Sequence, residues 1–196
     1  MGFFIKTVAE SEATGELREF YEEDIRNMGF VPNTTRAFSL LPDTFQGWMA
    51  LIRSIRKHMR LRNYELTTFA AALEMDCTYC KLAHGSLLRK NFFSAEQLEA
   101  IVADFHHAGL EEKEVLMMDY AQKVVGNAAS TTQEDFDKMR QAGWTDEDIL
   151  SITLAAAARS FASKIFDALG ADADSIYKDL DEETHHALLG NRPFVV

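Results

Sequence analysis

Few residues in this sequence can stop a helix, and those few fall mainly between segments with helical periodicity. The 196 residues contain three prolines and ten glycines. Between them, apolar side chains recur at the three- and four-residue spacing of an amphipathic helix. No segment shows the alternation of apolar and polar residues that is typical of a half-buried strand. The sequence therefore predicts an all-α fold.

Start and stop signals locate several of the predicted helices. Gly29 closes the first amphipathic segment, and a short helix is expected at Thr34–Leu41. A longer helix follows Pro42, because the residue before a proline is pushed out of the helical region. Ser94, with a glutamine three residues later, begins another helix with a capping box. The last long helix is expected at Thr145–Gly170.

Composition and charge exclude some function classes. Apolar residues make up 47% of the chain and charged residues 26%, as in an ordinary soluble domain. The net charge of -11 argues against a nucleic-acid-binding surface. The N-terminal apolar run is too short for a signal peptide, and the later run "ILSITLAAAA" is about half of a membrane span. We therefore expect a cytoplasmic protein with no nucleic-acid or membrane partner.

The chain has two cysteines, Cys77 and Cys80, and His84 follows the second by one helical turn. In a reducing cytosol, cysteines at this spacing are more typical of catalysis or metal binding than of a structural disulfide. A zinc site needs four ligands, and these residues supply three, so Glu65 or a neighbouring subunit would have to complete it. The favoured interpretation is a redox pair without a metal; a zinc site and two inert buried thiols are the alternatives.

Helix geometry predicts how the two cysteines would react. Asp76 is expected to be the N-cap of a helix that carries both cysteines in its first turn. Unpaired amides and the helix dipole favour a thiolate there. His84 could then exchange a proton with Cys80, which nominates Cys80 as the attacking thiol and Cys77 as the resolving one. The order used by thioredoxin-like sites would nominate Cys77 instead, and the residues alone leave both orders open.

Glu65 could complete a proton relay if the chain reverses near Met75–Asp76. In one unbroken helix Glu65 would lie roughly 18 Å from Cys77. If two helices instead run side by side, Glu65 comes closer to His84 than to either cysteine. The carboxylate would then orient the imidazole, in the order Glu65, His84, Cys80.

With these residues placed, the segment resembles the alkylhydroperoxidase D-like (AhpD-like) superfamily, also called the carboxymuconolactone decarboxylase family. Its redox-active members carry Glu, eleven residues, Cys-x-x-Cys, three residues and His, which here is Glu65 to His84. The segment "GFVPN" and the region up to Gly170 resemble the peroxidase-related branch. The similarity covers the chain from about Gly29 to Gly170.

The resemblance implies an all-helical fold and a homo-oligomer, with a trimer or hexamer favoured and a dimer possible. It also implies a cofactor-free thiol peroxidase that reduces organic hydroperoxides, with Cys80 as the peroxidatic cysteine. Cys77 would close the disulfide, and His84 with Glu65 would form the relay. The reductant would be a dithiol, such as a lipoyl- or thioredoxin-type protein. A protein disulfide-exchange partner is the alternative function, and a non-catalytic helical oligomer that binds zinc at the same residues is a further one.

One residue departs from the family pattern. The archetypal enzyme has a further histidine between its cysteines, whereas this chain has Tyr79. Tyr79 would shape the peroxide pocket or pack at a subunit contact. The pairs His106–His107 and His185–His186 are expected at solvated helix ends, and Ser160 and Ser163 are expected to be packing residues.

The expected organisation is one AhpD-like helical domain over residues 1–196. Residues 1–60 form an N-terminal helical extension, residues 61–125 the redox unit, and residues 126–196 a degenerate second unit with a tail. The second unit is inferred because "ELTTFAAALEMDCTYCKLAHG" aligns with "DILSITLAAAARSFASKIFDALG". A chance match between two alanine-rich helices is the alternative to duplication.

Overall fold

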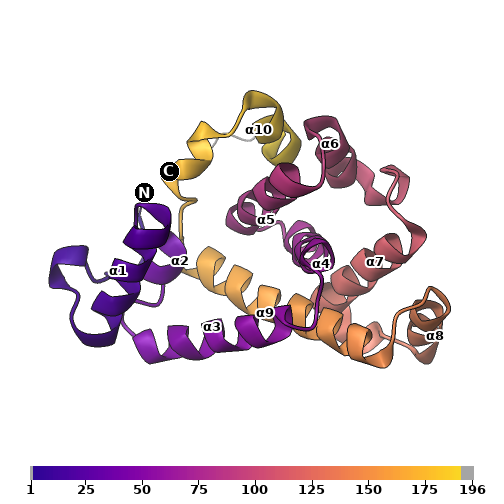
Figure 1. The fold of residues 1–196 in the computed structure, drawn as a ribbon, viewed down its shortest axis with the longest axis horizontal. Helices are drawn as coiled ribbons and strands as arrows, with labels where there is room; N and C mark the ends of the chain where they lie inside the picture. Colours follow the sequence, from indigo (N-terminus) through magenta and orange to yellow (C-terminus); the bar gives the residue numbers. More distant parts are fainter. Residues whose placement is uncertain (1, 191–196) are drawn as a thin grey trace.

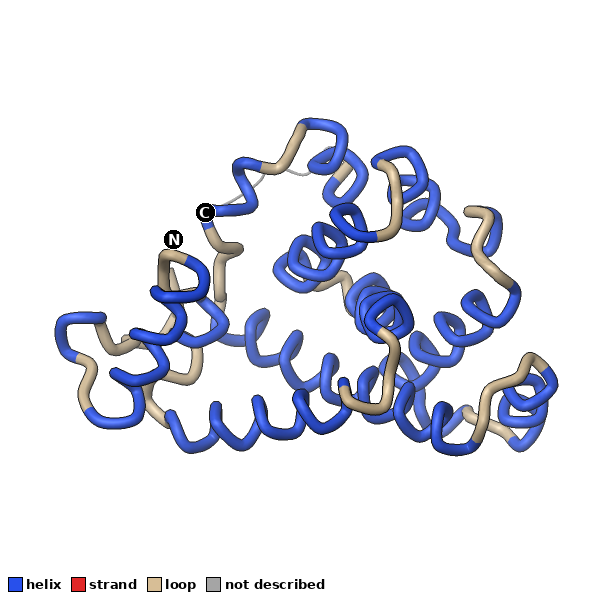
Figure 2. Tube along the Cα trace, in the orientation of Figure 1, coloured by secondary structure: helices blue, strands red, loops and turns tan. Residues whose placement is uncertain are grey.

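The computed structural model describes residues 2–190, and every regular element in that range is a helix (Figures 1 and 2). The all-α prediction is therefore confirmed. The α-helices are α1 (Gly15–Met28), α2 (Asn33–Arg36), α3 (Pro42–Arg56), α4 (Leu61–Glu74), α5 (Thr78–Asn91), α6 (Ala95–Asp104), α7 (Glu112–Asn127), α8 (Gln133–Gln141), α9 (Asp146–Leu169) and α10 (Glu182–Leu189). Short 3₁₀ turns are η1 (Glu10–Glu12), η2 (Phe105–His107), η3 (Ala128–Ser130) and η4 (Ser175–Asp179).

Helix α4 is the centre of the fold. It packs against α5, α7 and α9, which surround it in Figure 1. Its residues from Tyr64 to Ala72 are all buried, as expected for a helix covered on every side. Three of these residues, Glu65, Thr67 and Thr68, are polar, and buried polar groups require partners. The core helix thus carries polar side chains into the middle of the protein.

A tight turn reverses the chain between α4 and α5. Asp76 has a φ of 53°, in the left-handed region that asparagine and aspartate tolerate better than most residues. The Cys77 N–H donates to the Ala72 carbonyl (3.1 Å) and the Asp76 N–H to the Leu73 carbonyl (3.1 Å), which is the Schellman pattern. The prediction that Asp76 is the N-cap of α5 is wrong, because Asp76 closes α4 and Cys77 is the N-cap.

Two of the helix ends predicted before residue 60 are present in the structure, and a third differs. Gly29 ends α1 at a φ of 83°, and Pro42 is the first residue of α3. Helix α2 is shorter than expected, since it ends at Arg36. The chain continues in turns that bond over three residues, and Leu41, which precedes the proline, leaves the helical region.

Helix α9 contains the second alanine-rich segment and is continuous over 24 residues. The first alanine-rich segment is instead divided between α4 and α5. The predicted duplication and the domain boundaries stay predictions. Within the described residues α9 is the one helix long and apolar enough to cross a membrane, but it packs against α4 and α7 as a core helix.

Candidate active site

The first turn of α5 carries both cysteines. Cys77 is the N-cap and Cys80 is the third residue of the helix, so Cys80 lies among the amides that an α-helix leaves unpaired. Both thiols are free, and both residues are fully buried. The reversal at Asp76 brings α5 back along α4, as the relay hypothesis requires.

Glu65 and His84 meet between these two helices. Glu65 Oε2 lies 2.7 Å from His84 Nδ1, and the Thr68 hydroxyl lies 3.1 Å from the same nitrogen. The Thr68 hydroxyl also lies within donating distance of the Tyr64 carbonyl (2.9 Å). A carboxylate can only accept, so Nδ1 carries the proton and donates it. When the imidazole is neutral, its Nε2 is therefore an acceptor.

Burial keeps this imidazole neutral. The pKa of His84 is lowered, first by burial and then by the positive charge of Arg159. The interaction with Glu65 opposes this shift without cancelling it. His84 is therefore suited to accept a proton near neutral pH, which is what a general base must do.

The Cys80 sulfur is held by α9. Ser163 Oγ donates to Cys80 Sγ at 3.1 Å, and Arg159 Nη1 lies 3.7 Å from the same sulfur. His84 is one turn beyond Cys80, but these two described residues form no hydrogen bond with each other. The first link of the expected relay is present, and a direct second link is not.

The two thiols differ in acidity. The pKa of Cys80 is lowered by the hydrogen bond from Cys77 and, against the effect of burial, by Arg159 and Ser163. The pKa of Cys77 is raised, because it is the donor to Cys80 and is itself buried. Of the two thiols, Cys80 is therefore the one whose pKa favours the thiolate, and which cysteine attacks first stays a prediction.

Sequence analysis missed two residues of this site. Ser163 was expected to be a packing residue, and Arg159 was not singled out. An arginine inside the run "LAAAARSFAS" breaks an otherwise small and apolar helix, which is a signal for a specific partner. The partner itself is not readable from sequence, since Arg159 and Cys80 are 79 residues apart.

Through Asp174, Tyr79 connects the cysteine segment to the segment that follows α9 and to the start of α2. Its hydroxyl donates to Asp174 Oδ2, and Asp174 Oδ1 accepts from the Asn33 backbone N–H at 2.8 Å. The Tyr177 ring lies edge-on to Tyr79, with centroids 6.3 Å apart. The segment around Asp174 therefore covers the cysteine turn, and Tyr79 anchors that cover.

The two histidine pairs of the sequence lie at or near the surface of the protein. His106 and His107 are exposed and pair with Asp104, as expected for a helix end. His186 is exposed near Glu99, at 3.6 Å, and His185 is half-buried in α10. Within residues 2–190 no three His, Cys, Asp or Glu side chains are grouped to hold a metal ion. The zinc interpretation stays an alternative.

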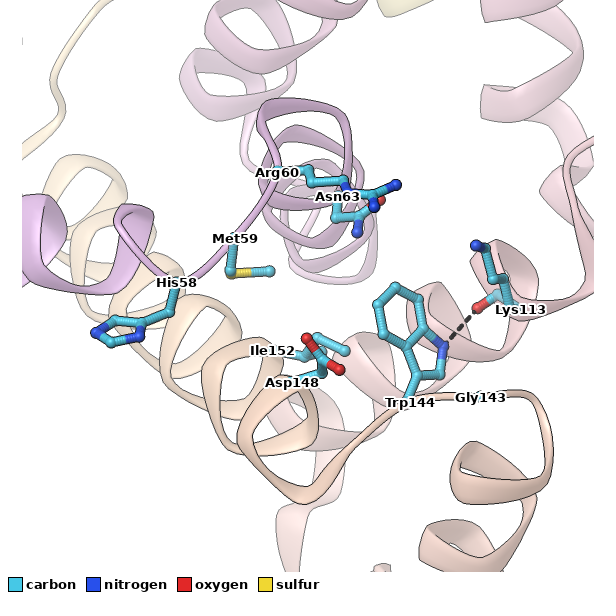
Figure 3. Close-up of a pocket in the computed structure, with 9 residues that line it drawn as sticks. All are labelled: His58, Met59, Arg60, Asn63, Lys113, Gly143, Trp144, Asp148 and Ile152. Carbon is cyan, nitrogen blue, oxygen red and sulfur yellow. Dashed lines mark hydrogen bonds between the residues drawn. The ribbon is translucent and has the colours of Figure 1, made fainter.

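A separate cavity of about 290 Å³ opens where the N-terminal ends of α4 and α9 meet (Figure 3). It is lined by His58, Met59, Arg60, Asn63, Lys113, Gly143, Trp144, Asp148 and Ile152. The Trp144 indole N–H donates to the Lys113 carbonyl at 3.0 Å, which fixes one wall. None of the four predicted site residues lines this cavity, so it is distinct from the thiol site.

Comparison with known proteins identifies the fold. No family model and no curated protein matches the sequence. An alkylhydroperoxidase AhpD core, an uncharacterized peroxidase-related protein from Ralstonia eutropha JMP134, has a TM-score of 0.81 at 21% identity, over 89% of this chain and 94% of that one. An uncharacterized peroxidase-related protein from Silicibacter sp. TM1040 has a TM-score of 0.76 at 20% identity, over 84% and 87%.

The debrominase Bmp8 is a third similar structure, with a TM-score of 0.73 at 16% identity, over 92% of this chain and 97% of that one. These likenesses show that the chain has the AhpD-like helical fold, which confirms the resemblance inferred from the Glu, Cys-x-x-Cys and His spacing. At such identities they define the fold and leave the reaction to be argued from the site.

Proposed function

We propose that this protein is a thiol-dependent peroxidase that reduces organic hydroperoxides with Cys80 and Cys77. The observation that carries the proposal is the placement of the Cys80 sulfur, 3.1 Å from Ser163 Oγ and 3.7 Å from Arg159 Nη1, on the helix turn that also carries Cys77. A thiolate is the reactive form of cysteine, and an adjacent thiol can resolve its oxidised form.

The reaction consists of three balanced steps. The Cys80 thiolate attacks the terminal oxygen of a hydroperoxide, an S–O bond forms, and the O–O bond breaks. The departing alkoxide takes up one proton from water and leaves as an alcohol, while Cys80 becomes a sulfenic acid. The Cys77 thiol then displaces water from Cys80 to form the disulfide. An external dithiol returns both cysteines to the reduced state by thiol–disulfide exchange.

Burial favours a small substrate over a protein partner in the first step. Both cysteines are fully buried, so a protein disulfide could reach neither sulfur without a large opening. A small hydroperoxide needs a much smaller opening to reach the sulfur of Cys80. Exchange with a lipoyl- or thioredoxin-type protein is therefore proposed for the regenerating step, when the cover around Asp174 must open.

Reductive dehalogenation is a second candidate. A variant of Bmp8 is known in complex with 2,3,4-tribromopyrrole, so the fold can hold a halogenated ring. A dithiol can also supply the two electrons that replace carbon–bromine with carbon–hydrogen, releasing bromide and a proton as the disulfide forms. The cation beside Cys80 suits a halide as well as an alkoxide.

The test is turnover of cumene hydroperoxide with a dithiol reductant, comparing the wild type with Cys80→Ser and Cys77→Ser. We expect Cys80→Ser to lose hydroperoxide consumption and Cys77→Ser to keep a single turnover. A Cys80→Ser protein that consumes hydroperoxide at the wild-type rate would exclude the proposal. Bromide release from a bromopyrrole, without hydroperoxide consumption, would favour the second candidate.

The cellular setting stays a proposal. We propose a cytoplasmic homo-oligomer, trimeric or hexameric by resemblance, that works without a cofactor. Light scattering of the purified protein measures the oligomer size, and a monomer at micromolar concentration would contradict this part.

A further inference from the structure

We infer that Arg159 is a further catalytic residue of this site. Its Nη1 stabilises the Cys80 thiolate, and its unpartnered Nε–H is the donor for the atom that leaves the substrate as an anion. The substrate class that fits is a hydroperoxide whose leaving oxygen carries negative charge. This inference rests on the proposed peroxidase function and adds a cationic group to a Glu, His and Cys site.

The first argument is the cost of a buried charge. Arg159 is 8% exposed, and a guanidinium in such a place requires an anion, because an uncompensated buried charge is strongly destabilising. Arg62 shows the usual solution, since its Nε and Nη2 lie 2.6 and 3.0 Å from the Glu114 carboxylate. Among residues 2–190 no carboxylate forms such an ion pair with Arg159. The Cys80 sulfur takes that place.

The second argument is an orphan donor. Arg159 Nε is buried and has no hydrogen-bond partner within the described residues. Buried donors without partners are rare in folded proteins and call for an explanation. The Nε–H of a guanidinium lies on the edge that it shares with Nη2, as in the Arg62–Glu114 pair, and the Nη1 of Arg159, 3.7 Å from the reacting sulfur, lies on the neighbouring edge of the same rigid plane. The leaving oxygen of the substrate, one bond beyond the oxygen that binds the Cys80 sulfur, is the acceptor that we assign to this Nε–H.

The titratable groups named below lie around the Cys80 sulfur, and Arg159 is the positively charged side chain in contact with it. Helix α4 contributes Glu65 and Tyr64, and the Glu65 carboxylate is committed to His84. From α9, Asp167 interacts with Cys77, and from η4 the phenol of Tyr177 lies near Cys80. The acidic groups disfavour a thiolate, and none of them can supply positive charge to it.

Arg159 would act at two moments of one step. Before attack it holds the sulfur as an anion. As the O–O bond breaks, the electron pair moves to the leaving oxygen, and the negative charge passes from sulfur to that oxygen. A fixed cation that donates to both atoms stabilises this transfer without reorganisation. The alkoxide then takes up a proton from water, so the guanidinium stays fully protonated.

The first measurement does not depend on activity. In a Cys77→Ser background, the far-ultraviolet absorbance of the Cys80 thiolate is followed against pH. We expect Arg159→Met to raise the midpoint by about 1 to 3 pH units, as for the loss of a neighbouring opposite charge. Arg159→Lys should retain most of the wild-type midpoint. Arg56→Met is the control, since it removes a nearby cation that does not touch Cys80. An unchanged midpoint in folded Arg159→Met would overturn the thiolate role.

The second measurement tests the leaving group. We expect Arg159→Lys to slow reaction with cumene hydroperoxide by about 10²-fold, the size of losing one oxyanion donor. The loss should be much smaller with a peracid, whose carboxylate needs little help to leave. If Arg159→Lys slows the reactions with cumene hydroperoxide and with the peracid by the same factor, the proposed role of Nε–H is wrong. If the wild type reacts with neither while the titrations differ as expected, the peroxidase proposal and the leaving-group role fail and the thiolate role stands.

Discussion

The Glu65 carboxylate lies 2.7 Å from Nδ1 of His84, although the two residues are 19 positions apart and both side chains are buried. The contact exists because Asp76 closes α4 in a left-handed conformation and returns the chain as α5. It fixes the histidine tautomer and directs the acceptor nitrogen away from Glu65.

Replacing this carboxylate should weaken the base. Glu65→Gln keeps an acceptor for Nδ1–H but removes the charge that raises the His84 pKa. We expect hydroperoxide consumption at pH 7 to fall by about 10²-fold, within the usual contribution of general base catalysis. Glu74→Gln, an exposed position on the same helix, is the matched control and should leave the rate unchanged. Equal rates for the wild type and Glu65→Gln would contradict the relay.

The pH dependence should have an acid limb set by Cys80. Because Cys77, Arg159 and Ser163 lower the pKa of Cys80, the thiolate persists to lower pH than in an ordinary cysteine. The second-order rate constant should reach its plateau below the ordinary thiol pKa of about 8.5 and decline as pH falls through the lowered value. A stopped-flow pH profile checks this. A midpoint at or above the ordinary value would contradict it.

Removing the resolving thiol should arrest the cycle. In Cys77→Ser the Cys80 sulfenic acid has no neighbour with which to condense, so it should accumulate after one turnover. Mass spectrometry should find one added oxygen, and a sulfenic-acid trap should label Cys80. An unmodified Cys80 after hydroperoxide has been consumed would assign the attack elsewhere.

The Tyr79–Asp174 hydrogen bond should control access to the thiols. Tyr79→Phe leaves a buried carboxylate without one of its donors, at a cost of about 1.5 to 3 kcal/mol for a hydrogen bond to a charged group. We expect a lower free energy of unfolding and faster labelling of the thiols by a maleimide. Tyr120→Phe, which loses a neutral contact with Thr153 far along the chain, is the control. Unchanged labelling would show that the cover opens by another route.

Substitution by alanine should change the free energy of unfolding in opposite directions at two glycines. A Cβ at Gly85 would lie 2.1 Å from a Leu188 methyl group and 3.1 Å from the Phe69 ring, so Gly85→Ala should destabilise by about 1 to 3 kcal/mol through overpacking. Gly47 lies inside α3 with no atom near such a Cβ. Gly47→Ala should therefore stabilise by about 0.5 to 1 kcal/mol. Denaturant unfolding measures both; equal effects would contradict this packing of α10 on α5.

Much of the fold followed from local signals. Helix ends at Gly29, Ser94 and Gly170 depend on neighbouring residues alone, and the structure has each of them as predicted. The Asp76 prediction failed because one aspartate can serve as an N-cap or as a left-handed C-terminal residue. The choice depends on how α4 must end against its neighbours.

Only some of the site residues could be predicted from the sequence. Glu65 and His84 share a short segment with one reversal, so their meeting could be predicted. Arg159 and Ser163 reach Cys80 because α9 packs across the first turn of α5, and no spacing rule connects segments 79 and 83 residues apart. Burial of the two thiols is likewise a property of the whole chain.

The most direct test of the central claim is a single turnover. Fully reduced protein is mixed with one equivalent of cumene hydroperoxide, and hydroperoxide, free thiols and intact mass are followed together. The account predicts loss of one hydroperoxide per chain, loss of both thiols and a mass lower by two hydrogens, as a Cys77–Cys80 disulfide requires. Hydroperoxide that persists while both thiols remain titratable would contradict it.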